Sequence, residues 1–193
     1  MTNSEFVEKY LKAKLTDQQK MVIDLPSDVL VRAHRRFGKT HCMLLKMAAQ
    51  WMQNPDKRFY FFSPSEQQSN NASEEFDKII DGVFISSSVR KPEFRALGRN
   101  SHTRLCGLTG DYFYVDDYEW ANDDQQTCFA LYPIFYDKYS KNKPKVYYTA
   151  TGRIKDWVGP ELKIALTKDD PLWNQISKEI SQTVWDYEYL LKD

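Results

Sequence analysis

Four short apolar segments recur along the chain, and helical patterns separate the first three. The segments are rich in β-branched and aromatic residues and lie at positions 29–31, 58–63, 111–115 and 145–151. Nearly continuous apolar runs of this length are typical of strands that are covered on both faces. The alternation of strands and helices predicts an α/β fold with a mainly parallel sheet and helices on both faces.

The helical patterns are spread along the whole chain. Two short capped helices are predicted near the start, at 4–12 with a Ser or Asn cap and at 15–23, and a largely buried helix is predicted at 42–51. A further helix begins after Ser65 and ends at Gly82. A proline-interrupted helix is predicted at 125–139. The segment at 83–105 has no clear pattern, and the tail at 169–185 fits either a strand or an amphipathic helix.

The loop that follows the first strand carries the clearest chemical signal. His34 to Thr40 reads His-Arg-Arg-Phe-Gly-Lys-Thr, and Gly38, Lys39 and Thr40 match the end of the phosphate-binding pattern G-x-x-x-x-G-K-[ST]. Ala33 stands in place of the first glycine, so the motif is a variant. A bare Gly-Lys-Thr can also simply begin a helix, but the preceding strand and the buried helix that follows favour a phosphate site. In such a site Lys39 binds the β- and γ-phosphates and Thr40 holds Mg²⁺.

The third strand ends in two adjacent carboxylates, Asp116 and Asp117. Beside a phosphate loop, the first carboxylate holds Mg²⁺ through water and the second polarises the attacking water. Alone, the pair is equally well explained as a strand that exits into a turn. Its position one strand and one helix after the loop favours the catalytic interpretation.

Other polar residues are weaker candidates. Thr149 and Thr151 end the fourth strand, where ligands bind in open α/β sheets, although a β-branched strand end without a ligand is an equal alternative. Gln19 precedes the phosphate loop by one helix and one strand, and its amide can pair with an adenine edge. A surface glutamine explains Gln19 as well.

Length, charge and cysteine spacing limit the classes of protein to which this chain can belong. The 193 residues are enough for one domain, and the 27 basic side chains balance 27 acidic ones, so any DNA contact must come from a local patch. The basic stretch at 90–104 is one such patch, or only a solvated face. Cys42, Cys106 and Cys128 are widely spaced, which favours reduced thiols over disulfides, and His41 beside Cys42 lacks zinc-ligand spacing. Without a signal peptide or a long apolar run, we expect a soluble protein that is not secreted.

The order and spacing of these motifs resemble the ATPase domain of the large terminase subunit of tailed bacteriophages. The resemblance runs from about Leu15 to Leu166. Gln19 matches the Q-motif of that family, and Arg35 matches the arginine three residues before the glycine of its phosphate loop. Gly107 lies shortly before the second motif, and 148–151 matches the coupling motif, after which a loop and a helix at 154–166 are expected.

The resemblance implies an ASCE/RecA-like P-loop NTPase that hydrolyses ATP with Mg²⁺ to move double-stranded viral DNA into a procapsid. Residues 1–193 would form one ATPase domain, with helices and Q-motif at 1–25, the P-loop core at 28–166, and an extension toward a possible linker at 167–193. The implied partners are DNA, the portal and procapsid, and the small terminase subunit, in a homo-oligomeric ring. The expected location is the cytoplasm of the infected bacterial host, with no membrane.

The site roles follow from the same resemblance. Asp117 would orient the attacking water and Arg35 would stabilise charge, either as a cis arginine or as a sensor of the γ-phosphate. The nucleotide would also contact Gln19 and the loop. The remaining expected ligands are Arg36, Phe37, Gly38, Lys39, Thr40, Thr149 and Thr151 for the nucleotide, and Thr40 with Asp116 for Mg²⁺.

The chain departs from the family at informative positions. Asp117 stands where the family has glutamate, so Asp117 acts with a shifted water, or Glu119 reaches in, or hydrolysis is slow. Gly152 replaces a frequent proline, and no room is left for the nuclease domain of the family. A helicase-like translocase and a nucleotide-binding switch or scaffold that does not hydrolyse ATP are the two alternatives.

Overall fold

Six parallel strands form one sheet in the order β3-β2-β4-β5-β1-β6. The computed structural model describes residues 1–83, 89–97, 105, 108–119, 143–152, 154, 157, 159–169, 173, 181–184, 186 and 189–191. The strands are β1 (Leu30–Ala33), β2 (Phe59–Ser63), β3 (Glu93–Ala96), β4 (Tyr112–Val115), β5 (Lys145–Ala150) and β6 (Glu161–Ile164). The predicted α/β fold with a parallel sheet is confirmed.

The strand order determines which chain segments meet. β5 lies between β1, which leads into the phosphate loop, and β4, which ends in the two carboxylates. Because all strands are parallel, the carboxyl ends of β1, β5 and β4 lie side by side at one edge of the sheet. The loop, the two acids, Thr149 of β5 and Thr151 just after it therefore lie at the same edge of the sheet.

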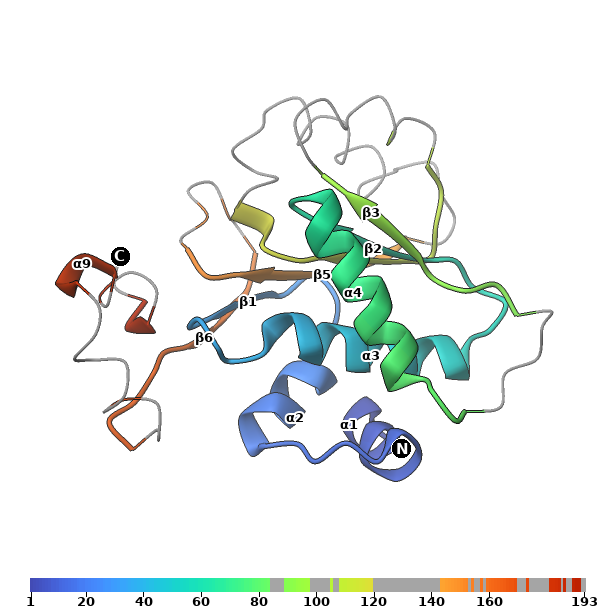
Figure 1. Ribbon diagram of the computed structural model, residues 1–193, viewed down its shortest axis with the longest axis horizontal. Coiled ribbons are helices and arrows are strands. Elements are labelled where there is room, and N and C mark those ends of the chain that lie inside the picture. Colours follow the sequence, from blue (N-terminus) through green and yellow to red (C-terminus); the bar gives the residue numbers. More distant parts are fainter. Residues whose placement is uncertain are drawn as a thin grey trace.

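Four helical segments near the N-terminus cover one face of this sheet. They are α1 (Asn3–Phe6) with the π-helix η1 (Val7–Leu11), α2 (Asp17–Asp24), α3 (Lys39–Gln53) and α4 (Glu66–Ile79), while a short α9 (Gln182–Val184) lies near the C-terminus. Figure 1 shows α3 along the sheet, α4 beside it, and α1 and α2 on the other side of α3. The helix predicted at 125–139 lies outside the described residues, and none of the described helices is both long and apolar enough to cross a bilayer.

Strand residues alternate between two buried layers. Phe61, Tyr114 and Tyr147 pack toward α3 and α4, while Phe62 and Tyr148 pack on the opposite face. This two-residue period is the geometry of a strand with both faces covered. It explains why the strand sequences are apolar almost throughout.

Most helix caps agree with the sequence. Thr16 caps α2 in a capping box with Gln19, and the Ser65 side chain caps α4 as predicted. The N-terminal helix differs, because Thr2 is its N-cap and Ser4 lies inside it, bonded to Asp24 at 2.5 Å. The expected Ser or Asn cap at this helix is therefore wrong.

The helix expected within residues 154–166 is also wrong, because this segment contains β6. Glu161 and Lys163 alternate with Leu162 and Ile164, which is a strand period, and β6 pairs in parallel with β1. The outer edge of β1 would otherwise leave a row of backbone groups unpaired. The local alternation and the free edge of β1 thus both favour a strand, whereas the helix was expected only from the resemblance.

Candidate active site

The loop between β1 and α3 has the backbone geometry of an anion site. Arg36 and Gly38 have positive φ angles of 66° and 86°, and Gly38 is the N-cap residue of α3. A left-handed backbone is costly for most side chains but not for glycine, so Gly38 permits the turn. The first N–H groups of α3 have no partner within the helix and point toward this crevice, which favours a bound phosphate.

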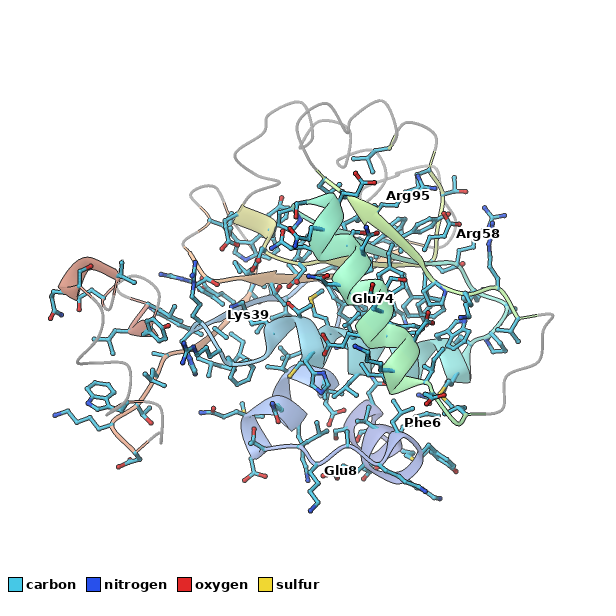
Figure 2. The ribbon with its side chains drawn as sticks, in the orientation of Figure 1. Phe6, Glu8, Lys39, Arg58, Glu74 and Arg95 are labelled. Carbon is cyan, nitrogen blue, oxygen red and sulfur yellow. The ribbon has the colours of Figure 1, made fainter. Side chains whose placement is uncertain are left out.

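Lys39 links the loop to β5. Its Nζ donates to the Ala33 carbonyl at 3.1 Å and to the Thr151 hydroxyl at 2.8 Å. Burial lowers the pKa of Lys39, and the charges of three neighbouring carboxylates oppose that effect. Figure 2 places Lys39 at the N-terminal end of α3, next to the strands that carry its partners.

Asp116 forms the centre of a second set of contacts. Its carboxylate accepts hydrogen bonds from the Thr40 hydroxyl at 2.6 Å and from the Thr149 hydroxyl at 2.5 Å. Burial raises the pKa of Asp116, while both hydroxyls and Lys39 act in the opposite direction. α3, β4 and β5 are thus joined by one buried carboxylate.

These oxygens fit a magnesium ion. A hydroxyl and a carboxylate are hard oxygen ligands, and Mg²⁺ typically takes only one or two protein ligands and keeps several waters. Within the described ranges, no group of three or more His, Cys, Asp and Glu side chains converges as a larger metal site. The donor set therefore suits a nucleotide-bound Mg²⁺ better than a structural metal.

Asp117 and Glu119 have different surroundings. Burial, followed by the charges of Asp116 and Glu119, raises the pKa of Asp117 to about 7, and Asp117 has a positive φ of 48°. Glu119 instead accepts two backbone N–H bonds at one oxygen, from Thr151 at 3.0 Å and Gly152 at 3.2 Å. The two carboxylates thus differ in their surroundings, because Glu119 joins the end of β5 through two N–H groups while Asp117 lies between two other acids.

The arginines and Gln19 complete the site. Arg35 is exposed, and its charge lowers the pKa of both Asp117 and Lys39, so it lies near them. Arg36 is exposed on the same loop. The Gln19 amide nitrogen lies 3.9 Å from the point where a Cβ on Gly38 would stand, while its Oε1 accepts the capping bond from Thr16 N–H at 3.0 Å.

Phe37 is a predicted ligand whose side chain packs into the core instead of the loop. Its ring is buried in the core between α3 and β1. The Phe37 N–H donates to the His34 carbonyl at 3.2 Å, which closes the turn. Only the backbone of Phe37 faces the loop.

The described part of the basic stretch, residues 90–97, lies elsewhere. Arg95 pairs with Glu93 at 2.8 Å and Lys91 with Asp77 at 3.0 Å, and Figure 2 shows Arg95 well apart from Lys39. Arg99 and Arg104 lie outside the described residues, as do Gly107, Cys106 and Cys128. Cys42 is a buried free thiol whose pKa burial raises to about 12.

Sequence reasoning missed two features of this site. It did not foresee that Glu119 would tie β4 to the end of β5, and it did not select Ser63 at the end of β2. The signal for Ser63 was present, since it is the first polar residue after four aromatic ones in a buried strand.

No known family profile and no curated protein matches this sequence. Solved structures do match. The large terminase ATPase domain of Thermus phage P74-26 aligns with a TM-score of 0.62 at 11% identity, over 98% of both chains. This chain has the fold of a phage large-terminase ATPase domain.

Two further solved structures align with this chain, a second large terminase and a DEAD box protein. The large terminase of a thermophilic bacteriophage in complex with ADP aligns with a TM-score of 0.65 at 10% identity, over 91% of this chain. This chain spans about half of that longer protein, 53% of which is covered. A DEAD box protein from Methanococcus jannaschii aligns with a TM-score of 0.56 at 14% identity, over 83% of this chain. At these identities the likeness establishes the P-loop NTPase fold.

Proposed function

We propose that this chain is the ATPase domain of a viral DNA-packaging motor, in which ATP hydrolysis moves double-stranded DNA into a procapsid. One observation carries the proposal, namely the buried network Lys39–Thr151 and Thr40–Asp116–Thr149. It joins the phosphate loop, the acid strand and the coupling strand through groups that a nucleotide would compete for. A ligand at the loop would therefore alter the position of the end of β5.

The loop would bind the triphosphate. Lys39 would exchange its Ala33 and Thr151 contacts for the β- and γ-phosphates, and the backbone of residues 36–40 would surround the phosphate oxygens. Gln19 would offer its free amide hydrogens to the adenine edge, since its carbonyl oxygen already accepts the capping bond. The neighbour bound to ADP supports nucleotide binding by this fold.

Thr40 and Asp116 would hold Mg²⁺, which supplies charge neutralisation at the phosphates. Asp117 would accept a proton from the attacking water, because a carboxylate with a raised pKa is an effective base near neutral pH. Arg35 would stabilise the charge that develops on the γ-phosphate. Thr149 and Thr151 would report the loss of that phosphate to the end of β5.

The wider proposal follows from the terminase fold. Residues 1–193 would act as one ATPase unit, with 167–193 leading toward a linker. The working form would be a homo-oligomeric ring in the host cytoplasm that contacts duplex DNA, the portal and procapsid, and the small subunit. A helicase-like translocase is the second candidate, and the DEAD box neighbour favours it.

Steady-state ATP hydrolysis tests the proposal. We expect Mg²⁺-dependent turnover that duplex DNA stimulates, that Lys39→Ala abolishes, and that separates no strands of a DNA duplex. Strand separation would favour the helicase-like candidate. Nucleotide binding without turnover, with or without duplex DNA, would contradict the motor and favour a switch or scaffold.

A further inference from the structure

Ser63 is a buried polar residue without a partner. It is the last residue of β2 and is 1% exposed, and its Oγ makes no hydrogen bond with the described part of the chain. Burying an unpaired hydroxyl is costly, and buried hydroxyls in native proteins are nearly always bonded to protein, water or a ligand. The hydroxyl therefore needs a partner that a bound group can supply.

The sheet register places Ser63 beside Asp116. Phe62 pairs with Val115 across β2 and β4, and the Asp116 N–H donates to the Phe62 carbonyl at 2.9 Å. The next residues along, Ser63 and Asp116, are therefore neighbours on adjacent strands.

The side chains of Ser63 and Asp116 also point to the same face of the sheet, the one that α3 covers. Phe61 on β2, Tyr114 on β4 and Tyr147 on β5 all pack toward α3. Side chains two positions further along a strand point to the same side. Ser63, Asp116 and Thr149 therefore form a row of oxygen-bearing side chains under the start of α3.

The carboxylate at the centre of this row is already engaged. Its two oxygens accept hydrogen bonds from the Thr40 and Thr149 hydroxyls, and the Ser63 hydroxyl does not bond to either of them. A water there would have Ser63 as one partner and the bound metal as another. Mg²⁺ keeps several waters of its shell when proteins bind it, and each such water needs acceptors or donors around it.

We infer that Ser63 is a positioning residue that holds a water of the Mg²⁺ shell beside Asp116. The inference rests on the proposed function, because the ion enters with the nucleotide. Ser63 would not contact the phosphates. It would raise the affinity for the metal–nucleotide complex without affecting nucleotide binding in the absence of metal.

Calorimetric titration with ADP tests this, in Mg²⁺ and in EDTA, together with the melting temperature of the free protein. The variants are Ser63→Ala and Ser63→Thr, which keeps the hydroxyl. Ser69→Ala is the matched control, because Ser69 is buried to a similar degree but belongs to α4 and not to the strand that pairs with β4.

For Ser63→Ala we expect an about fivefold to tenfold weaker affinity for ADP in Mg²⁺, the usual effect of one hydrogen bond, and an unchanged affinity in EDTA. Ser63→Thr should keep at least half of the metal effect, and Ser69→Ala should match the wild type. The melting temperature of free Ser63→Ala should equal or exceed that of the wild type, since the unpaired hydroxyl is gone.

Three results would overturn the inference. A lower melting temperature of free Ser63→Ala would assign the hydroxyl a structural role, and an equal loss in EDTA would assign it to the nucleotide. An affinity for ADP in Mg²⁺ equal to that of the wild type would remove any role at the metal. A wild-type protein that binds no ADP under either condition would instead contradict the proposed function itself, and the inference with it.

Discussion

Asp117 has a backbone conformation that few residues other than glycine adopt. Asp117 lies two residues beyond the last residue of β4 and has a φ of 48°, and its N–H donates to the Thr149 hydroxyl at 3.3 Å. Strained backbone of this kind persists where the surroundings hold it, and it concentrates at functional sites. The turn gives Asp117 and Glu119 different surroundings, although both are carboxylates in one short segment.

The two carboxylates should respond differently to loss of charge. We expect Asp117→Asn to lower kcat by about 100-fold or more, the usual effect of removing a general base. Glu119→Gln keeps an oxygen that can accept the Thr151 and Gly152 N–H bonds, so we expect less than about tenfold loss. Steady-state kinetics on both variants measures this. The opposite ranking would make Glu119 the base.

The pH dependence of the reaction should report Asp117. Its pKa of about 7 means that the carboxylate is protonated, and inactive as a base, below that pH. We expect kcat/KM to fall about tenfold per pH unit below pH 6 and to be level above pH 8. A profile measured from pH 5.5 to 9 checks this. A flat profile down to pH 5.5 would show that no group with a pKa near 7 controls the reaction.

At the scale of elements, α3 carries a buried cation into the core. Lys46 is 3% exposed, its Nζ donates to the Leu25 carbonyl at 2.5 Å, and it lies 4.2 Å above the Tyr147 ring. Burial lowers the pKa of Lys46 to about 7. The contacts of Lys46 tie α3 to the end of α2 and to β5, at some electrostatic cost.

That cost predicts a pH-dependent stability. Between pH 7 and 10.5 the unfolded chain keeps the Lys46 proton that the folded chain has lost, so the free energy of unfolding rises with pH. Relative to Lys46→Met, we expect the wild type to gain up to about 1.4 kcal/mol per pH unit from pH 7 to 8.5. Urea unfolding at several pH values measures the difference.

Lys57→Met is the control for this experiment, because the Lys57 side chain is 40% exposed. Its difference from the wild type should be independent of pH over the same range. A constant difference for Lys46→Met as well would mean that the Lys46 ammonium stays charged in the folded core.

At the scale of the whole molecule, the C-terminal segment returns to β1, the strand that leads into the phosphate loop. The buried Arg32 of β1 donates to the Leu191 carbonyl at 3.2 Å, and the Leu166 N–H donates to the Tyr189 carbonyl at 2.8 Å. Tyr189 and Leu191 are themselves buried. Residues 189–191 therefore contact β1 and the segment just after β6, and the Tyr189 ring stacks on His34 at the start of the phosphate loop.

Removal of that segment should destabilise the domain. Deleting residues 189–193 strips two buried side chains and one carbonyl partner of Arg32, so we expect a loss of about 3 kcal/mol and a fall of about 6–12 °C in Tm. Deletion of 192–193 alone is the control and should leave Tm nearly unchanged. Differential scanning calorimetry compares the two, and equal Tm values would mean that the contacts of 189–191 contribute little.

Much of the fold was predictable because it depends on local composition. The central strands were visible as apolar runs, and Ser65 as a cap, since cap and strand preferences act within a few residues. β3 and β6 were missed because each has four residues at a sheet edge, where few apolar side chains are needed. The expected Ser or Asn cap of the N-terminal helix was wrong because Thr2, Asn3 and Ser4 are adjacent and all three residue types are good caps.

The sequence alone determined the phosphate loop, the paired acids and the threonines at a strand end, since each is a short motif whose chemistry depends on its own residue types. Only the tertiary structure decided which of them meet. The placement of β5 between β1 and β4 brings Thr151 to Lys39 and Glu119 to the backbone of 151–152. The pairing of β2 with β4 likewise brings Ser63 beside Asp116. Strand order and register arise from pairing between distant segments, and no local pattern encodes them.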